Sequence, residues 1–165
     1  MSFATLTARA IPINLLAYIT DDDTQEAAIT AAGGDGLKLI KTVSQTVANR
    51  LKPSYPAIAF VDDNDAKDYS GDVITAVYVA TFEVNVVDRN PDTAVANARI
   101  YEAAVESMIL NCPYATLTAN TGATSCQIQQ IESGFDPIKT DEGQKEFLQT
   151  FQVRATWLLV AGAYA

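Results

Sequence analysis

Two long stretches of alternating polarity constrain the fold more than any other feature of the sequence. In residues 73–87, one side of an extended chain carries Ile74, Tyr78, Phe82, Val84 and Val86. In residues 146–160, one side carries Phe147, Phe151, Val153, Trp157 and Leu159. A period of two residues is that of a β-strand with one face in a core. At about 3.3 Å per residue the first strand exceeds the usual length, so we expect it to bend or to extend past its sheet.

Three helices are predicted from caps and helical spacing. Asn90 as cap and Pro91 in the first turn begin a helix that ends near Asn111. Its inner face carries Ala94, Ala98, Tyr101, Val105 and Met108. Apolar residues at intervals of three and four predict a second helix over 37–52, before Pro53. A short third helix is predicted to start within 21–24 and to run over 25–32, with Thr24 as a possible cap and the acidic residues 21–23 at its positive end.

The remaining segments are shorter or irregular. Residues 1–20 are expected to form an arm that is extended or partly helical, since Pro12 interrupts an alternating pattern. Residues 57–61 are expected to form a short strand followed by an acidic loop at 62–72. A strand is expected from Cys126, and its alternation slips at Ile131, which indicates a bulge.

The order of these elements predicts an α+β fold. We expect a mixed or mainly antiparallel sheet of about four strands, with two main helices on one face and an N-terminal extension. The predicted division is an arm and short helix at 1–36, a domain at 37–160 and an apolar tail at 161–165. A parallel nucleotide-binding sheet is not expected, because strands do not alternate singly with helices.

Charge and composition exclude several classes of function. The net charge of -9, with only 11 scattered Lys and Arg, argues against binding the nucleic-acid backbone. No apolar run is long enough to cross a bilayer, and the N-terminus does not resemble a signal peptide. The chain has no histidine, which removes the commonest general base and transition-metal ligand. We therefore expect neither an enzyme nor a bound metal or cofactor.

The acidic and sulfur-containing residues give weak signals of chemistry. The acidic loop contains Asp62, Asp63, Asp65, Asp68 and Asp72. Asp63 and Asp65 match the first positions of a calcium-binding loop, but Lys67 occupies the next one and the central glycine is missing. We interpret this segment as a solvated loop. The two cysteines are expected to be free, although the intervening loop leaves a pairing of Cys112 with Cys126 open.

Surface contacts remain as the route to a function. The outer side of the 73–87 strand carries Val77, Val79 and Glu83 among smaller polar residues. The chain ends are also apolar, with Leu15 and Leu16 near one end and Tyr164 near the other. Apolar ends dock either on their own domain or on a neighbour. We predict these six residues as a protein–protein interface.

One known family shows a similar order of elements. Residues 37–52 lead directly into Tyr55-Pro56-Ala57-Ile58, a long strand passes through Asp88-Arg89-Asn90-Pro91 into an Ala-rich helix, and the strand 147–159 closes the chain. This order resembles the tail terminator, or tail-completion, proteins of long-tailed bacteriophages, and more loosely their neck and head–tail joining proteins. The resemblance covers roughly residues 37–160 and involves no catalytic motif.

The resemblance implies a structural virion protein in the tail or neck that assembles in the host cytoplasm. It implies a homo-oligomeric ring, expected as a hexamer, that caps the tail tube protein and meets a neck or connector protein. DNA would pass through the lumen without specific binding, and no membrane would be involved. The alternatives are another neck or tail tube component, or a small carboxylate-based enzyme or ligand-binding domain.

Overall fold

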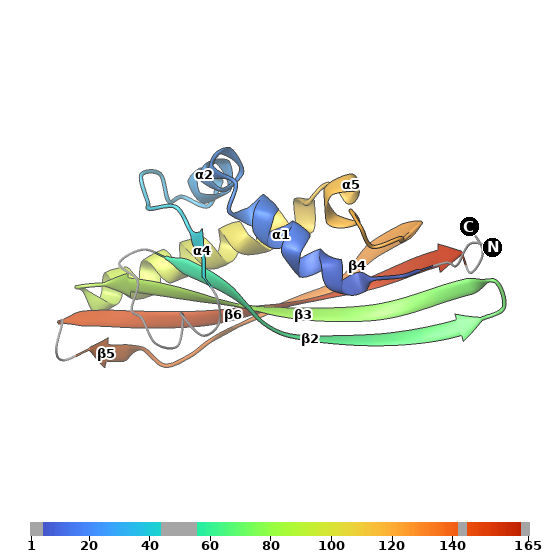
Figure 1. The fold of residues 1–165 in the computed structure, drawn as a ribbon. Coiled ribbons are helices and arrows are strands. Elements are labelled where there is room, and N and C mark those ends of the chain that lie inside the picture. The colour runs from blue at the N-terminus through green and yellow to red at the C-terminus, as the bar shows by residue number, and fades with distance from the viewer. Residues whose placement is uncertain (1–4, 44–55, 142–144, 163–165) are drawn as a thin grey trace.

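The computed structural model describes residues 5–43, 56–141 and 145–162. It has an α+β fold in which a six-stranded sheet carries its helices on one side (Figure 1). The elements in chain order are η1 Ala8–Ala10, α1 Ile11–Ile19, α2 Asp22–Ala31, β1 Lys41–Thr42, β2 Ala57–Ser70, β3 Val73–Asp88, α4 Pro91–Asn111, α5 Tyr114–Leu117, β4 Ser125–Phe135, β5 Lys139–Asp141 and β6 Glu146–Gly162. The predicted fold class is confirmed, with a sheet that has more strands than expected.

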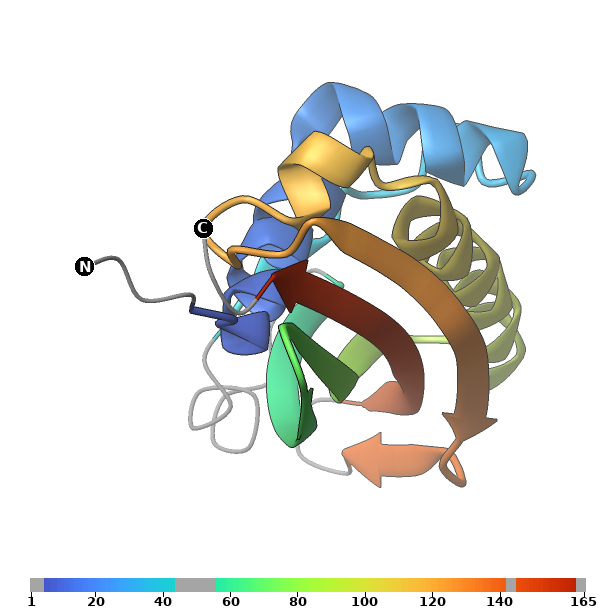
Figure 2. The same cartoon turned by 90° about the vertical axis from the view of Figure 1, so that its right-hand side faces the viewer.

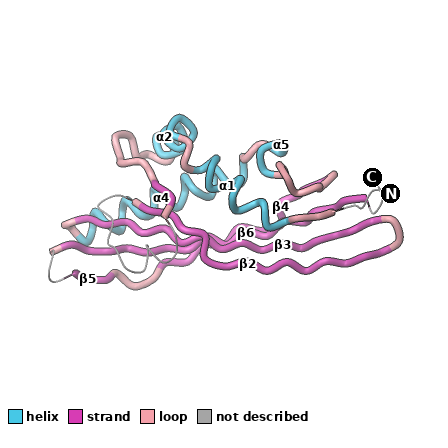
Figure 3. Tube along the Cα trace, viewed as in Figure 1, coloured by secondary structure: helices cyan, strands magenta, loops and turns pink. Residues whose placement is uncertain are grey.

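The two strands with the clearest alternation form the centre of the sheet. The strand order is β1-β2-β3-β6-β4, with β5 also paired to β6 (Figure 3). β3 and β6 are antiparallel over their full length, from Val73 opposite Gly162 to Asp88 opposite Phe147. The only parallel pair among the described strands is β1 with β2. The first two residues of the predicted 161–165 tail therefore belong to β6, and Tyr164 lies outside the described residues.

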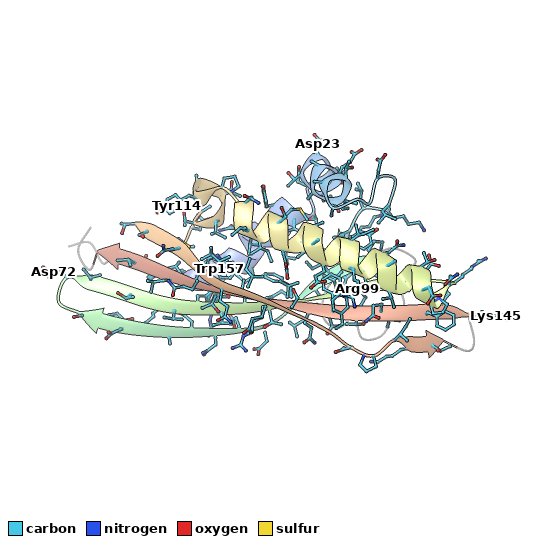
Figure 4. The ribbon with its side chains drawn as sticks, turned by 180° about the vertical axis from the view of Figure 1, so that it is seen from behind. Asp23, Asp72, Arg99, Tyr114, Lys145 and Trp157 are labelled. Carbon is cyan, nitrogen blue, oxygen red and sulfur yellow. The ribbon has the colours of Figure 1, made fainter. Side chains whose placement is uncertain are left out.

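The core lies between the sheet and the helices. Tyr78, Phe82, Phe151 and Trp157 are fully buried on the predicted inner faces of β3 and β6, whereas Phe147 is only half-buried. Trp157 points toward the helix layer (Figure 4), and its ring stacks on Tyr78 with centroids 6.3 Å apart. The core-facing residues of α4 include buried alanines, whose small side chains allow a helix to approach a sheet closely.

The predicted start of α4 is confirmed. Asn90 is the N-cap, and its side-chain oxygen accepts hydrogen bonds from the backbone N–H groups of Asp92 at 2.9 Å and Thr93 at 3.4 Å. Pro91 occupies the first helical position, where its missing N–H has no partner to lose.

Of the two forms expected for the N-terminal arm, the structure shows the partly helical one, and its helix α1 is docked on the core. Ile11, Leu15 and Ile19 are fully buried in the core, because their spacing of four residues places them on one face of α1. Pro12 is compatible with a helix since it lies in the first turn. The Asn14 side chain donates to the backbone oxygens of Leu117 at 2.9 Å and Ala119 at 2.8 Å, which ties α1 to the α5 region.

The predicted cap of the short helix was wrong by three residues. Asp21 caps α2, and one of its carboxylate oxygens accepts from the Thr24 backbone N–H at 3.0 Å and the Thr24 hydroxyl at 2.7 Å. Thr24 is therefore a donor to the cap. The hydrogen bonds from Thr24 lower the pKa of Asp21, since they stabilise the carboxylate.

The helix predicted over 37–52 is wrong in its described part. Residues 37–43 contain no helix, Lys41–Thr42 form the strand β1, and residues 44–52 lie outside the described residues. The buried amide of Gln25 holds this segment, since its nitrogen donates to the Ile40 oxygen at 3.1 Å and its oxygen accepts from the Ile40 N–H at 2.6 Å. These bonds take backbone groups that a helix would have used for itself.

The expected acidic loop at 62–72 is also wrong. Residues 62–70 continue β2 and pair with β3 as far as Ser70 opposite Val73, so the loop shrinks to a turn in which Gly71 has φ +61°. A bulge between Phe60 and Asp62 shifts the register of this strand. The bulge predicted in β4 lies between Ile128 and Gln130, close to the expected position.

Candidate functional site

No described helix covers one face of the sheet, which we call the open face (Figures 1 and 2). Toward the β2–β3 turn this face carries a row of aliphatic side chains from the two central strands: Val73, Val77, Val79, Leu158 and Val160. Val77 lies opposite Leu158, and residues opposite each other in an antiparallel pair share a face. Val73 is 41% exposed and Val77 is 43% exposed. Contiguous exposed apolar side chains of this kind mark contact surfaces.

A hollow of about 480 Å³ lies further along the open face. It spans four strands and is lined by Val61, Asp62, Thr81, Glu132, Ser133, Gly134, Gln152 and Arg154. The bulges of β2 and β4 lie beside it on opposite edges of the sheet. Bulges increase the local bend and twist of a strand, and the sheet is visibly curved when seen end-on (Figure 2). The hollow is therefore a product of sheet curvature.

The β2–β3 hairpin extends past the helices and ends in an exposed turn (Figure 1). Asp72 lies at this end of the molecule (Figure 4). We call residues 69–73 the hairpin tip. Its largest side chain is Tyr69, which is 70% exposed although it is an aromatic residue in a strand. The long strand thus extends beyond the helix-covered part of the sheet, but not past the sheet itself as expected, because β2 and β6 pair with it as far as Val73.

Four of the five acidic residues of the predicted loop separate onto the two faces of β2, and Asp72 lies in the β2–β3 turn. Asp62 and Asp68 lie opposite Thr81 and Thr75 on the open face. Asp63 and Asp65 point to the other face, where Asp63 accepts from the Tyr78 hydroxyl at 2.8 Å.

The carboxylates on the helix side form local ion pairs. The Arg9 side chain lies 3.4 Å from Asp63, and the Lys67 nitrogen lies 3.7 Å from Asp65. Burial and the Asp63 carboxylate raise the pKa of Tyr78. Within the described residues, no group of three or more His, Cys, Asp or Glu could hold a metal ion. Asp63 therefore connects η1 to the hairpin, and it has a structural partner that a solvated loop would not provide.

The predicted interface residues have mixed positions. Val77, Val79 and Glu83 lie on the open face, and Leu16 is half-buried against the core. Leu15 is fully buried in the protein's own core, so it is withdrawn from the predicted interface. Tyr164 lies outside the described residues.

The cysteines are both free and partly buried. Burial raises the pKa of each thiol to about 11. Both thiols therefore stay protonated near neutral pH, and protonated thiols are poor nucleophiles.

Sequence reasoning missed several residues of the open face. The alternation of β6 places Arg154, Leu158 and Val160 on the side opposite the core, and this signal was present in the sequence. Tyr69 is expected in a loop from the sequence, because its acidic neighbours obscure the alternation of the strand.

No described helix is long and apolar enough to span a membrane.

Comparisons with known proteins give matches among solved structures. No protein-family model and no curated protein matches the sequence significantly. Among solved structures 33 chains match, including one from a structure described as "Virion of native gene transfer agent (GTA) particle". That chain is 15% identical, with a TM-score of 0.42, over 89% of this chain and 96% of its own length. This degree of likeness is too low to assign a function.

Proposed function

We propose that this protein is a structural component of a phage-like virion that works through contacts with copies of itself and with neighbouring virion proteins. The observation that carries the proposal is the open face, where Val73 and Val77 of β3 are exposed beside half-buried aliphatic side chains of β6. A sheet face of this kind is normally covered by a helix, a second sheet or a partner. The histidine-free sequence is consistent with a function based on contact surfaces.

Within that class, we propose a role as a tail terminator. The chain would form a ring, expected as a hexamer, that caps the tail tube and presents a surface to the neck or connector. Support comes from the resemblance in element order, in which a long strand leads through an Asn-Pro cap into an Ala-rich helix and a long strand closes the sheet. Its location would be the tail or neck of the virion, after assembly in the host cytoplasm.

The charge of the chain fits a lumen through which DNA moves. With a net charge of -9, each subunit would repel phosphates, so a ring of subunits would let DNA slide without gripping it. A ring that bound DNA tightly would need clustered Lys and Arg instead.

The test is the mass and shape of the assembled protein. Light scattering after size-exclusion chromatography, followed by electron microscopy, should give one discrete species at a multiple of 17.7 kDa, seen as closed rings. Open tubes of variable length would point to a tube component and overturn the terminator role. A 17.7 kDa monomer at every concentration up to the millimolar range would overturn the proposal as a whole.

A further inference from the structure

Arg154 is a cation without a partner at the centre of the open face. It lines the hollow, and among the described residues it makes no hydrogen bond, ion pair or ring contact. Glu132 lies directly opposite it on β4, but that carboxylate accepts from Gln130 instead. An unpaired guanidinium offers a flat surface on which an aromatic ring can stack. The carboxylates of Asp62 and Glu132 beside it offer acceptors for a hydroxyl.

Tyr69, at the far end of the hairpin, has the chemical groups that fit the hollow around Arg154. Its phenol combines an aromatic ring, which stacks on guanidinium groups, with a hydroxyl that donates to carboxylates. The side chain is 70% exposed at the hairpin tip. A tyrosine held on an extended hairpin is well suited to insert into a surface hollow, because little conformational entropy is lost on binding.

We propose that the hairpin tip of one copy inserts Tyr69 into the hollow of a second copy. There the ring stacks on Arg154, and the hydroxyl donates to Asp62 or Glu132. The inference rests on the proposed self-assembly and names the contact that produces it. The hollow of about 480 Å³ lies within the size range of binding pockets, and its lining offers both the cation and the acceptors that a phenol requires.

The contact must be between copies. Tyr69 pairs with Ile74, and Asp62 pairs with Thr81, so several residues of strand separate the tip from the hollow. At about 3.3 Å per residue this separation is on the order of 20 Å, and Tyr69 also points to the opposite face of the sheet. Each copy thus has one tip and one hollow at different places. Such a heterologous contact generates a closed ring or an open filament.

Two single variants and their mixture test this contact. Tyr69→Ser removes the aromatic ring at the hairpin tip, and Arg154→Gln removes the guanidinium on which that ring would stack. Both side chains are exposed, so melting temperatures should stay within about 2 °C of the parent. Each variant alone should weaken self-association at least about 30-fold, as expected for loss of a Tyr or Arg that dominates an interface.

The mixture gives the sharper result. Tyr69→Ser retains an intact hollow and Arg154→Gln retains an intact tip, so an equimolar mixture should form heterodimers and stop there. Sedimentation velocity measures this directly. Tyr114→Ser and Arg89→Gln serve as matched controls, since both residues are exposed outside the contact, and they should assemble like the parent.

The outcomes separate the two proposals. If the parent assembles and both variants assemble equally well, the tip-and-hollow contact is refuted while the proposed function stands. Assembly of the mixture beyond a dimer, at a concentration where each variant alone is monomeric, would also refute it, because the contact between a heterodimer and a further copy would lack either Tyr69 or Arg154. If the parent never assembles, the proposed function itself fails.

Discussion

Gln25→Leu should be among the most destabilising substitutions in the N-terminal half. Gln25 is 1% exposed, and its amide donates to the backbone oxygens of Thr20 and Ile40 and accepts from the Ile40 N–H. Leucine fills a similar volume but makes none of these bonds. Ile40 is itself 1% exposed, so its N–H and C=O would be left buried without partners.

The magnitude follows from the two orphaned backbone groups. Each buried group that loses its partner costs about 1–3 kcal/mol, and burying the more apolar leucine offsets roughly 1 kcal/mol of the total. A net loss of about 3 kcal/mol corresponds to a fall in melting temperature of about 6–12 °C for a domain of this size. Circular dichroism with heat and with urea would measure both quantities.

Glu26→Leu provides the matched control. Glu26 is the next residue of α2 and is exposed, so the same new side chain there should change the free energy of unfolding by less than about 0.5 kcal/mol. If Gln25→Leu is no more destabilising than Glu26→Leu, Gln25 does not hold the 37–43 segment in its extended form. Amide hydrogen exchange at Ile40 should accelerate in Gln25→Leu alone.

Three further outcomes are expected. Asn90→Ala should cost about 1 kcal/mol in urea unfolding, because two N–H groups at the start of α4 lose their acceptor, and an unchanged midpoint would contradict that cap. Gly122→Ala should destabilise much more than Gly71→Ala: both have positive φ, at 74° and 61°, but a Cβ at Gly122 would lie 2.1 Å from the Thr5 oxygen whereas the space at Gly71 is open. Stability should also fall in alkaline solution. The pKa values of Cys112 and Cys126 are about 11 in the folded protein, above the thiol pKa of about 8.5 in the unfolded chain. Their contribution to stability is therefore complete below about pH 8.5 and is lost as the pH rises toward 11. A double Cys→Ser variant should lose less stability than the parent between pH 8 and pH 11, and equal losses would refute the assignment to the thiols.

The elements that the sequence predicts correctly are those with dense local signals. β3 and β6 follow from alternation over many residues, and α4 follows from its Asn-Pro start and helical spacing. In these elements the local preference and the tertiary contacts favour the same structure, so the pattern alone is sufficient.

The elements that it predicts wrongly depend on distant contacts. Residues 37–43 have helical spacing, yet Gln25 holds Ile40 in an extended form from another helix. The acidic half of β2 resembles a loop, but β3 is long enough to pair with it as far as Ser70. In neither case does the local sequence pattern indicate the distant residues that hold the segment in place.

The candidate surface was predicted only in part. Val77 and Val79 interrupt the polar side of β3, and this interruption correctly indicated an apolar outer face. Leu15 was misassigned because helix α1 was not predicted, and an apolar residue in an expected arm was interpreted as a contact. The alternation of β6 places Arg154 on the outer side, but its isolation from a partner depends on how β3, β6 and β4 align, which no local pattern shows.

The sedimentation-equilibrium mass of Val77→Lys/Val79→Lys, measured beside the parent, shows whether the open face mediates self-association. We predict that the parent sediments as an assembly of 17.7 kDa subunits, and that the double variant falls toward the single-chain mass with its melting temperature retained. Ile13→Lys, a charge placed at a residue 72% exposed on α1, should leave the assembly intact. A double variant that retains the parent's mass would contradict this role, because the open face would then contribute nothing to self-association.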